Sequence, residues 1–147
     1  MPAVADPDVE LLKRVTVFSV LNDEERERFA TAATRTEHTP GEAITEQGVM
    51  GHRFHLIVEG GAEVVRDGTQ VATLGPGEFV GELGLLGGGA STATVRCTEP
   101  TLCLTIQREE FWAVLEEEPA IALRILEVVC RRLVQELRTD HANLGPG

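Results

Sequence analysis

The sequence predicts a mainly β protein with flanking α-helices: an antiparallel β-roll or jelly roll of about eight strands, preceded by helices and followed by a long C-terminal helix. Three observations predict this fold class. Short apolar or alternating runs, broken by glycine, fill residues 35–107. Asp67-Gly68 separates two of these runs, which is a strong hairpin signal. After residue 107 the apolar residues recur in steps of three and four, the period of a helix.

The first part of the chain, residues 6–33, is predicted to be helical. Asp6 or Asp8 is positioned to cap a first short helix that continues through Val15. Asn22 is positioned to cap a second helix, because acidic residues follow it in what would be the first turn.

The second part, residues 35–107, is predicted to form the β-roll. Turn signals recur every 8–12 residues, which is typical of an antiparallel barrel or jelly roll and not of a parallel sheet with crossover helices. The clearest strand candidates are Phe54–Val58, Ala62–Val65, Val71–Leu74, Thr92–Val95 and Leu102–Ile106.

The third part, residues 108–141, returns to helix. Residues 109–118 form one helix, and Pro119 stops it and opens the next, which continues to His141. The apolar stripe of this last helix consists of Ala122, Ile125, Leu126, Val129, Leu133 and Leu137. Two interpretations of the stripe stay open: a parallel homodimer through the 119–141 helix, or packing on the chain's own β-roll.

Length and charge limit the possible functions. The chain has 147 residues, 42% of them hydrophobic and 25% charged, and residues 1–147 are expected to form a single domain. With 13 basic against 24 acidic side chains, the net charge of −11 argues against nucleic acid as a partner. No apolar run approaches the roughly 20 residues of a membrane span, and the N-terminus has no signal-peptide pattern. We therefore expect a cytoplasmic protein with no membrane partner.

The cysteines and histidines do not indicate a cofactor. Cys97, Cys103 and Cys130 are interpreted as free thiols, the first two as small buried residues. The less favoured alternative is a disulfide between Cys97 and Cys103, which flank a turn signal and would face each other across a hairpin. His52 and His55 lie three residues apart where loop meets strand, so we expect them on opposite faces. We expect neither a metal nor any other cofactor.

The glycine- and leucine-rich stretch 79–95 carries the candidate chemistry. Glu82 is a lone carboxylate there, which is costly to bury unless it meets strong hydrogen-bond donors. Residues Leu83–Leu86 can form one helical turn whose first N–H groups attract an anion. One interpretation places a sugar hydroxyl on Glu82 and a phosphate on the turn. The other is that Glu82 caps a backbone turn inside an empty jelly roll.

Three blocks of sequence carry a family resemblance. They are Gly41-Glu42-Ala43-Ile44 with Gly48 and Gly51, then Phe54–Gly60, then Leu74–Leu83. Set between N-terminal helices and a long last helix, they resemble the cyclic-nucleotide-binding domain. This is the fold of the catabolite activator protein and of the regulatory subunits of cyclic-AMP-dependent protein kinase. The resemblance covers essentially residues 8–140.

The resemblance implies a ligand and a site. In the family, the segment matching 81–93 is the phosphate-binding cassette, and the glutamate matching Glu82 accepts the ribose 2′-hydroxyl. In the family, the backbone amides at the positions matching Leu83 and Gly84 face the phosphate. The implied small-molecule ligand is a cyclic nucleotide, cAMP or cGMP. The candidate ligand-binding residues are Phe79, Val80, Gly81, Glu82, Leu83, Gly84, Ser91, Thr92 and Ala93.

Ser91 departs from the family pattern. Family members that bind cyclic nucleotide usually have an arginine at this position, in a pattern like Pro-Arg-Thr-Ala-Thr, where this chain has Ala90–Thr94. Serine cannot copy the charged, bidentate fork of arginine. Hydrogen bonds to charged groups contribute about 1.5–3 kcal/mol each, so losing one weakens binding about 10- to 150-fold. We therefore expect weakened cyclic nucleotide binding.

Other arginines offer no convincing replacement for the missing charge. We expect Arg96 on the outer face of its strand and Arg53 at the surface. For Arg131 and Arg132, an ordinary solvated helix face is the favoured interpretation. The deficit of basic residues is therefore expected to extend into the pocket, where the overall negative charge also opposes an anionic ligand.

The leading hypothesis is a non-catalytic sensor or regulatory module. By resemblance, ligand entry closes segment 81–92 and repositions the last helix. Because no DNA-binding segment follows, the output is expected to pass through an unknown protein effector or a change in the dimer. The alternative is the same fold used as a protein-interaction scaffold or for another small ligand, with haem on Pro2, Cys97, His52 or His55 the weakest variant. No readable Ser/His/Asp, Cys/His or metal arrangement favours an enzyme.

Overall fold

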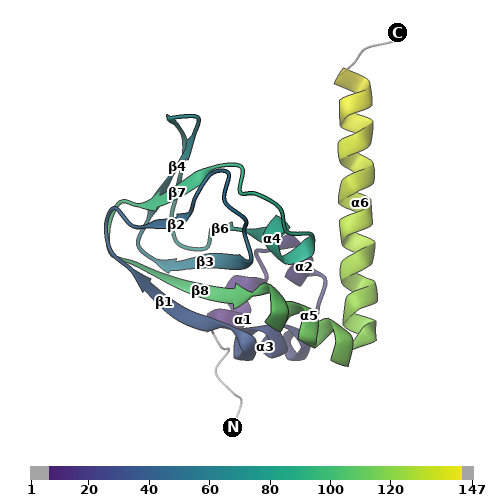
Figure 1. Ribbon diagram of the computed structural model, residues 1–147. Helices are drawn as coiled ribbons and strands as arrows, with labels where there is room; N and C mark the ends of the chain where they lie inside the picture. Colours follow the sequence, from purple (N-terminus) through teal and green to yellow (C-terminus); the bar gives the residue numbers. More distant parts are fainter. Residues whose placement is uncertain (1–6, 144–147) are drawn as a thin grey trace.

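The computed structural model describes residues 7–143, with side chains as far as Thr139. In this part of the chain, helices flank eight strands that form two antiparallel sheets (Figure 1). The helices are α1 (Pro7–Leu12), α2 (Thr16–Ser19), α3 (Asp23–Ala32), α4 (Glu82–Leu86), α5 (Arg108–Glu117) and α6 (Pro119–Asn143). The strands are β1 (Thr34–His38), β2 (Ala43–Thr45), β3 (Arg53–Glu59), β4 (Ala62–Arg66), β5 (Thr69–Leu74), β6 (Phe79–Val80), β7 (Thr94–Cys97) and β8 (Thr101–Gln107). The predicted fold class is confirmed.

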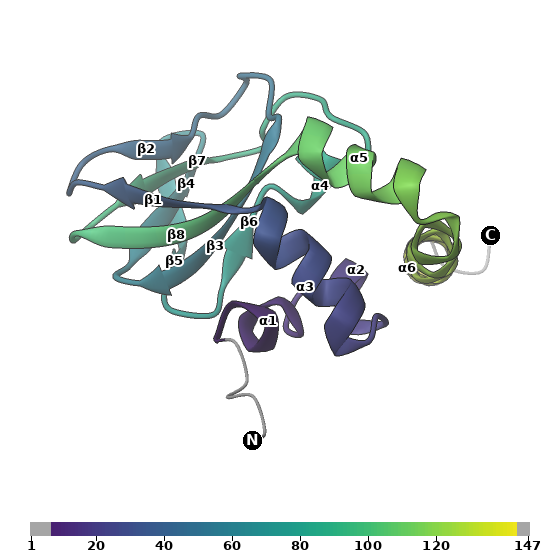
Figure 2. The ribbon, with the colours of Figure 1, turned by 90° about the horizontal axis from the view of Figure 1, so that it is seen from below.

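The two sheets form the walls of the β-roll. Their strand orders are β1-β8-β3-β6 and β2-β7-β4-β5, and the helices gather at one end of the roll (Figure 2). The hairpin between β4 and β5 turns at Asp67-Gly68, whose φ angles of 53° and 78° suit a type I′ turn. The predicted Asp-Gly hairpin is therefore confirmed.

The structure confirms the predicted N-terminal cap of one N-terminal helix, but another of these helices ends earlier than predicted. The side chain of Asn22 accepts a hydrogen bond from the Glu25 N–H, and the Glu25 carboxylate accepts one from the Asn22 N–H, which confirms the predicted cap of α3. The first helix does not continue through Val15. It ends three residues earlier, because the chain tightens there into hydrogen bonds between residues three apart. Asp8 lies inside the first turn of α1, and Asp6 lies outside the described residues.

Two hydrophobic clusters hold the fold together. The larger one lies where the helices close the end of the roll, and Phe18 and Phe29 meet there with ring centroids 4.9 Å apart. Leu85 of α4 is fully buried in the same cluster, so the helical end of the molecule anchors the candidate site. The smaller cluster joins strands of both sheets and consists of Ile57, Ala62, Val95 and Cys103.

One strand begins later than its sequence predicts. Strand pairing was expected from Thr92, whereas β7 begins at Thr94. The preceding residues bond the loop before β3 instead: the Ser91 N–H donates to the Val49 carbonyl (2.9 Å), and the Gly48 N–H donates to the Ser91 carbonyl (2.8 Å). This pairing holds the end of the cassette against the loop.

The cysteines Cys97, Cys103 and Cys130 are free thiols. The expected hairpin between the first two is wrong, because β7 and β8 belong to different sheets. Their interpretation as small buried residues is confirmed. Burial raises the pKa of the Cys103 thiol to about 12, so it is unreactive near neutral pH.

The C-terminal residues form α5 and α6, and Pro119 is the first residue of α6, as predicted. Ile121 and Ile125 are buried, but every described side chain from Cys130 to Thr139 is exposed. The interpretation that the apolar stripe packs on its own β-roll is therefore wrong for its second half. Figures 1 and 2 show α6 standing to one side of the roll. No helix in the described part of the chain is long and apolar enough to cross a membrane.

Candidate functional site

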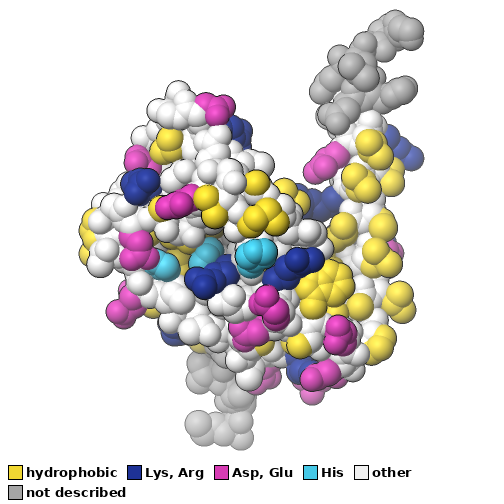
Figure 3. All heavy atoms as spheres, viewed as in Figure 1, with side chains coloured by type: hydrophobic (Ala, Val, Ile, Leu, Met, Phe, Trp, Pro, Cys, Tyr) yellow, Lys and Arg dark blue, Asp and Glu magenta, His cyan; other side chains and the backbone are white. Residues whose placement is uncertain are grey.

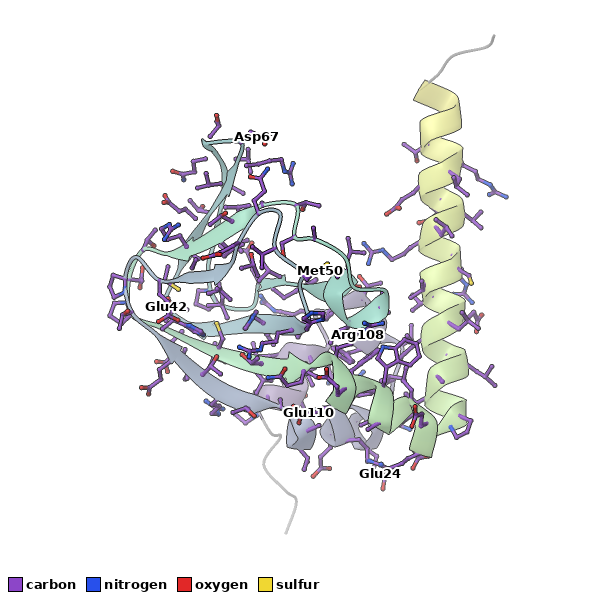
Figure 4. The ribbon with its side chains drawn as sticks, viewed as in Figure 1. Glu24, Glu42, Met50, Asp67, Arg108 and Glu110 are labelled. Carbon is purple, nitrogen blue, oxygen red and sulfur yellow. The ribbon has the colours of Figure 1, made fainter. Side chains whose placement is uncertain are left out.

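A cavity of about 290 Å³ lies against the segment that the sequence singled out. All nine predicted residues line it, from Phe79 to Gly84 and from Ser91 to Ala93. Residues of β2, β3, β4 and β7 also line it, so both sheets contribute, and the loop residues Gly51 and 88–90 complete the lining. In Figure 4, Met50 of the loop before β3 lies beside α4, and Asp67 marks the tip of the β4–β5 hairpin.

Glycine is required where the segment turns from β6 into α4. Gly81 has a φ of 88°, and a Cβ there would lie 2.2 Å from the Arg53 carbonyl oxygen. On the far side of α4, the indole N–H of Trp112 donates to the Leu85 carbonyl at 2.8 Å. The short helix is thus fixed by β3 on one side and by α5 on the other.

Glu82 is the partly buried carboxylate that lines the cavity in the described part of the chain. Its side chain is only 12% exposed, and Arg132 of α6 donates to its Oε1 at 2.9 Å. Burial raises the pKa of the Glu82 carboxyl, and the positive charge of Arg132 opposes that rise. The expectation that Arg132 lies on a purely solvated helix face is wrong. The carboxylate meets a charged donor instead of capping a backbone turn.

The far end of the segment is held mainly through its backbone. Ser91 is half-buried. If Gly51 carried a Cβ, that atom would lie 3.2 Å from the Ser91 Oγ, so the loop before β3 and the cassette lie close together here. The Thr92 carbonyl accepts a hydrogen bond from Nε of Arg66 (3.2 Å). The Ala93 carbonyl accepts one from the Thr45 hydroxyl (3.2 Å).

Two arginines, Arg53 and Arg66, line the cavity. Arg53 is exposed, as expected, but it stands at the edge of the cavity. Arg96 is exposed, as its strand position predicts, and it donates a hydrogen bond to the Gly41 carbonyl. Arg131 forms an ion pair with Glu127 on α6. Among the described residues, the lining holds two arginines against the one carboxylate of Glu82, so the expectation that the deficit of basic residues extends into the pocket is wrong.

Sequence reasoning missed Arg66, although a local signal pointed to it. Side chains alternate along a strand, so Arg66 shares a face of β4 with Ala62 and Val64. Ala62 is buried between the sheets, and Val64 lines the cavity. By contrast, the approach of Arg132 to Glu82 had no local signal, because 50 residues separate them.

The two neighbouring histidines lie as their spacing predicts. His52 is exposed and His55 is buried, on opposite sides of the chain where β3 begins. Nδ1 of His55 lies 3.0 Å from the Thr105 hydroxyl. Burial, aided by the positive charges of His38 and Arg53, lowers the pKa of His55 to about 4.

These features define a β-roll domain that has a small cavity lined by the glycine-rich segment and a long helix, α6, beside the roll. Residues 35–118 match the family model described as cyclic nucleotide-binding domain. Because that match spans more than half of the chain, the chain belongs to the cyclic nucleotide-binding domain family.

Regulatory subunits of cAMP-dependent protein kinase are similar to this chain over most of its length. A cAMP-dependent protein kinase regulatory subunit of Debaryomyces hansenii is 32% identical over 107 residues, which are 72% of this chain and 24% of that protein. The subunit of the same name from Yarrowia lipolytica is 35% identical over 106 residues, 71% of this chain and 28% of that protein. The chain thus spans about a quarter of the length of these curated relatives.

Solved structures share the fold. The N-terminal domain of a transcriptional regulator from Streptomyces coelicolor A3(2) superposes with a TM-score of 0.81 at 27% identity, covering 88% of this chain and 94% of that one. The Thermus thermophilus catabolite activator protein superposes with a TM-score of 0.67 at 29% identity, covering 87% of this chain and 63% of that one.

Proposed function

We propose that this chain is a regulatory module, a single domain over residues 1–147, that binds a cyclic nucleotide in the cavity beside Glu82. One observation carries the proposal: a partly buried carboxylate, that of Glu82, lines a cavity together with the segment that matches the family's cassette. The names of the kinase regulatory subunits support the same class of ligand. The cavity volume of about 290 Å³ lies just below the usual range for small-molecule sites, which begins at about 300 Å³.

The ligand class follows from the chemistry of the lining. The Glu82 carboxylate is suited to accept a hydrogen bond from a sugar hydroxyl, as the matching glutamate does in the family. Positive charge from Arg53 and Arg66 suits a single phosphate group. The apolar side chains of Val64, Phe79 and Val95 suit the flat face of a base.

Ser91 weakens this binding. Its hydroxyl offers one neutral donor at the position where family members that bind cyclic nucleotide usually have arginine. The loss of a charged hydrogen bond reduces affinity about 10- to 150-fold. We therefore propose a module that responds to high ligand concentrations, with cAMP and cGMP as the ligands to test first.

The ion pair between Arg132 and Glu82 couples the cavity to α6. A sugar hydroxyl that bonds Glu82 competes with Arg132 for the same carboxylate oxygen. Ligand binding therefore weakens the attachment of the second half of α6 to the cassette. An output of this kind reaches another molecule through α6.

A homodimer through α6 is the proposed assembly. Leu123, Leu126, Cys130, Leu133 and Leu137 follow each other at steps of three and four, and all are exposed. This spacing is that of a coiled-coil seam. Figure 3 shows hydrophobic side chains along α6 on the face in view. The effector that receives the signal is proposed to be a protein, as the acidic charge of −11 disfavours nucleic acid.

Calorimetric titration with cAMP and cGMP tests the ligand and the role of Ser91 together. We expect weak binding by the native chain and binding at least tenfold tighter by Ser91→Arg, because the new guanidinium can hold the phosphate. Thr98→Arg is the matched control: it adds the same charge in the exposed turn after β7, outside the cavity, and is expected to change nothing.

The outcomes separate the two claims. Submicromolar binding by the native chain contradicts the weakening by Ser91. Equal gains from Ser91→Arg and Thr98→Arg contradict the placement of the phosphate, because a general change of charge then explains both. No binding by the native chain or by Ser91→Arg contradicts the nucleotide proposal and favours the alternative, a protein-interaction scaffold presented by α6.

A further inference from the structure

Arg66 is an exposed residue that lines the cavity from a strand outside the three sequence blocks that carry the family resemblance. It is the last residue of β4, immediately before the Asp67-Gly68 turn, and it lines the cavity together with Ser91 and Thr92. The pairing of Val65 with Thr94 brings this end of β4 beside the end of the cassette. The alternation of side chains along β4 then directs Arg66 to the same face as the cavity-lining Val64.

The hydrogen bonds of Arg66 leave the end of its guanidinium available. Nε donates to the Thr92 carbonyl at 3.2 Å, which fixes the guanidinium against the cassette backbone. Among the described residues, no carboxylate forms an ion pair with Arg66. The adjacent acidic side chain, Asp67, instead accepts a hydrogen bond from the Gln47 amide at 2.8 Å. The two terminal nitrogens form the fork that binds phosphate.

This situation contrasts with other arginines of the chain. Carboxylates outnumber basic side chains by 24 to 13, yet neither of the two cavity-lining arginines, Arg53 and Arg66, forms an ion pair with a carboxylate of the described residues. The arginines that pair with carboxylates are Arg26, Arg28, Arg35, Arg124, Arg131 and Arg132.

Arg53 is a weaker candidate for the same role. It lines this cavity, but it also lines the adjacent hollow that contains His52 and His55. Among the described residues, no hydrogen bond joins the guanidinium of Arg53 to the cassette, whereas Arg66 is bonded to Thr92. A cation that is already oriented loses less conformational freedom on binding.

We propose that Arg66 is the phosphate-binding cation of this site, taking from β4 the role that Ser91 cannot fill. The inference rests on the proposed function, because it assigns the anionic group of that ligand. It assigns the charged contact with the phosphate to the β4–β5 hairpin instead of to the cassette. Ligand binding then joins hairpin and cassette through a single guanidinium, with Nε on Thr92 and the terminal nitrogens on the phosphate.

A double-mutant cycle with cAMP tests this assignment. The proteins are the native chain, Arg66→Gln, Ser91→Arg and the double variant, each titrated by calorimetry. Glutamine keeps a donor for the Thr92 carbonyl and removes the charge. We expect Arg66→Gln to weaken native binding at least tenfold, and to weaken Ser91→Arg by less than threefold, because the introduced arginine then holds the phosphate.

Arg96→Gln is the matched control. Arg96 is also an exposed arginine of the same sheet with a single bond to a backbone carbonyl, that of Gly41 at 2.7 Å, but it does not line the cavity. Its substitution is expected to leave the affinity unchanged. Binding by Arg66→Gln within twofold of the native chain overturns the proposal, as does an equal loss from Arg66→Gln and Arg96→Gln.

A second measurement separates this inference from the proposed function. Inorganic phosphate is titrated into the native chain, and the Nε–H resonance of Arg66 is followed by NMR. A saturable shift, absent in Arg53 and Arg96, supports Arg66 as the phosphate site even if neither cyclic nucleotide binds. Cyclic nucleotide binding without any response at Arg66 overturns the inference and leaves the proposed function standing. No shift with phosphate and no nucleotide binding overturns both.

Discussion

The ion pair between Glu82 and Arg132 shows how a carboxylate that is costly to bury is stabilised in this structure. A carboxylate that is 12% exposed would be destabilising without a charged donor, and Arg132 supplies that donor at 2.9 Å. Because Arg132 is itself 45% exposed, the pair is accessible enough to be exchanged for a ligand hydroxyl. The ion pair therefore compensates for the partial burial of Glu82, and we propose that a ligand hydroxyl can replace it.

His55 is a second buried ionisable residue, and it predicts a pH dependence of stability. Its pKa is lowered from 6.5 to about 4, chiefly by burial, while His38 and Arg53 contribute positive charge nearby. A lowered histidine pKa gives stability that is complete above pH 6.5 and is lost as the pH falls to 4. Protonation over this window is expected to reduce the free energy of unfolding by about 3 kcal/mol.

Urea unfolding at several pH values between 7 and 4 measures this effect. We expect His55→Gln to show a distinctly shallower loss of stability with acid than the native chain. The exposed His52→Gln is the control and is expected to keep the native dependence. The same acid sensitivity in all three proteins contradicts the role given to His55.

At the scale of elements, α6 has two halves with different environments. Ile121 and Ile125 pack into the larger core, whereas the side chains from Cys130 to Thr139 are exposed. Exposed leucines at coiled-coil spacing are costly to leave in water. The same helix also carries Arg132, so its attachment to the cassette and its availability to a second copy are linked.

Oxidative cross-linking tests the parallel dimer. In a parallel coiled coil, the two copies of a seam residue lie side by side, so Cys130 can form a disulfide with its counterpart. Cys97 and Cys103 are buried and do not compete. We expect a mild oxidant to produce a covalent dimer on non-reducing gels from the native chain, and none from Cys130→Ser.

Two further variants show whether the seam holds the dimer. Leu133→Glu is expected to reduce cross-linking and to shift the sedimentation coefficient to that of a monomer. Gln135→Glu, which adds the same charge at an exposed position off the seam, is expected to behave as the native chain. A monomeric native chain at all accessible concentrations contradicts the dimer.

At the scale of the whole molecule, charge is unevenly distributed. The chain carries −11, yet the lining of the cavity contains two arginines and one glutamate, and that glutamate is paired with a further arginine. Net charge therefore argues against a large polyanion as partner without arguing against a small anionic ligand. The field of a few nearby groups dominates at the site, because distant charges are screened by salt.

Truncation tests how much of the molecule the fold requires. A chain ending at Cys130 keeps Ile121 and Ile125 and loses only exposed side chains among those described. At low protein concentration we expect its free energy of unfolding to fall by about 1 kcal/mol. Glu82 loses the charged donor Arg132, but the removal of the second half of α6 also exposes the Glu82 carboxylate to water, which replaces part of the lost stabilisation.

A chain ending at Ala120 is the comparison, since it also removes both buried isoleucines. We expect it to lose several kcal/mol, because each buried aliphatic side chain contributes about 2–5 kcal/mol. Urea unfolding measures both. If the first truncation is as destabilising as the second, the exposed half of α6 takes part in the fold of the monomer.

Much of the fold was predictable because it depends on neighbours in sequence. The Asn22 cap, the Asp67-Gly68 turn and the start of α6 at Pro119 each rest on contacts within about four residues. The end of α1 was not predictable in this way. Helical propensity continues past it, and burial of Val15 in the core decides where the chain turns.

The sequence alone determined the β-roll, the cassette and the place of Glu82, because alternation, turn residues and the family blocks are local patterns. Only the tertiary structure decided which charges surround the cavity. Arg66 meets Thr92 across 26 residues, and Arg132 meets Glu82 across 50. Such contacts depend on strand pairing and on the path of a helix packed elsewhere, and no local preference encodes them. The departure from arginine at Ser91 is visible in the sequence, whereas the replacement that we propose, Arg66, can be recognised only in the fold.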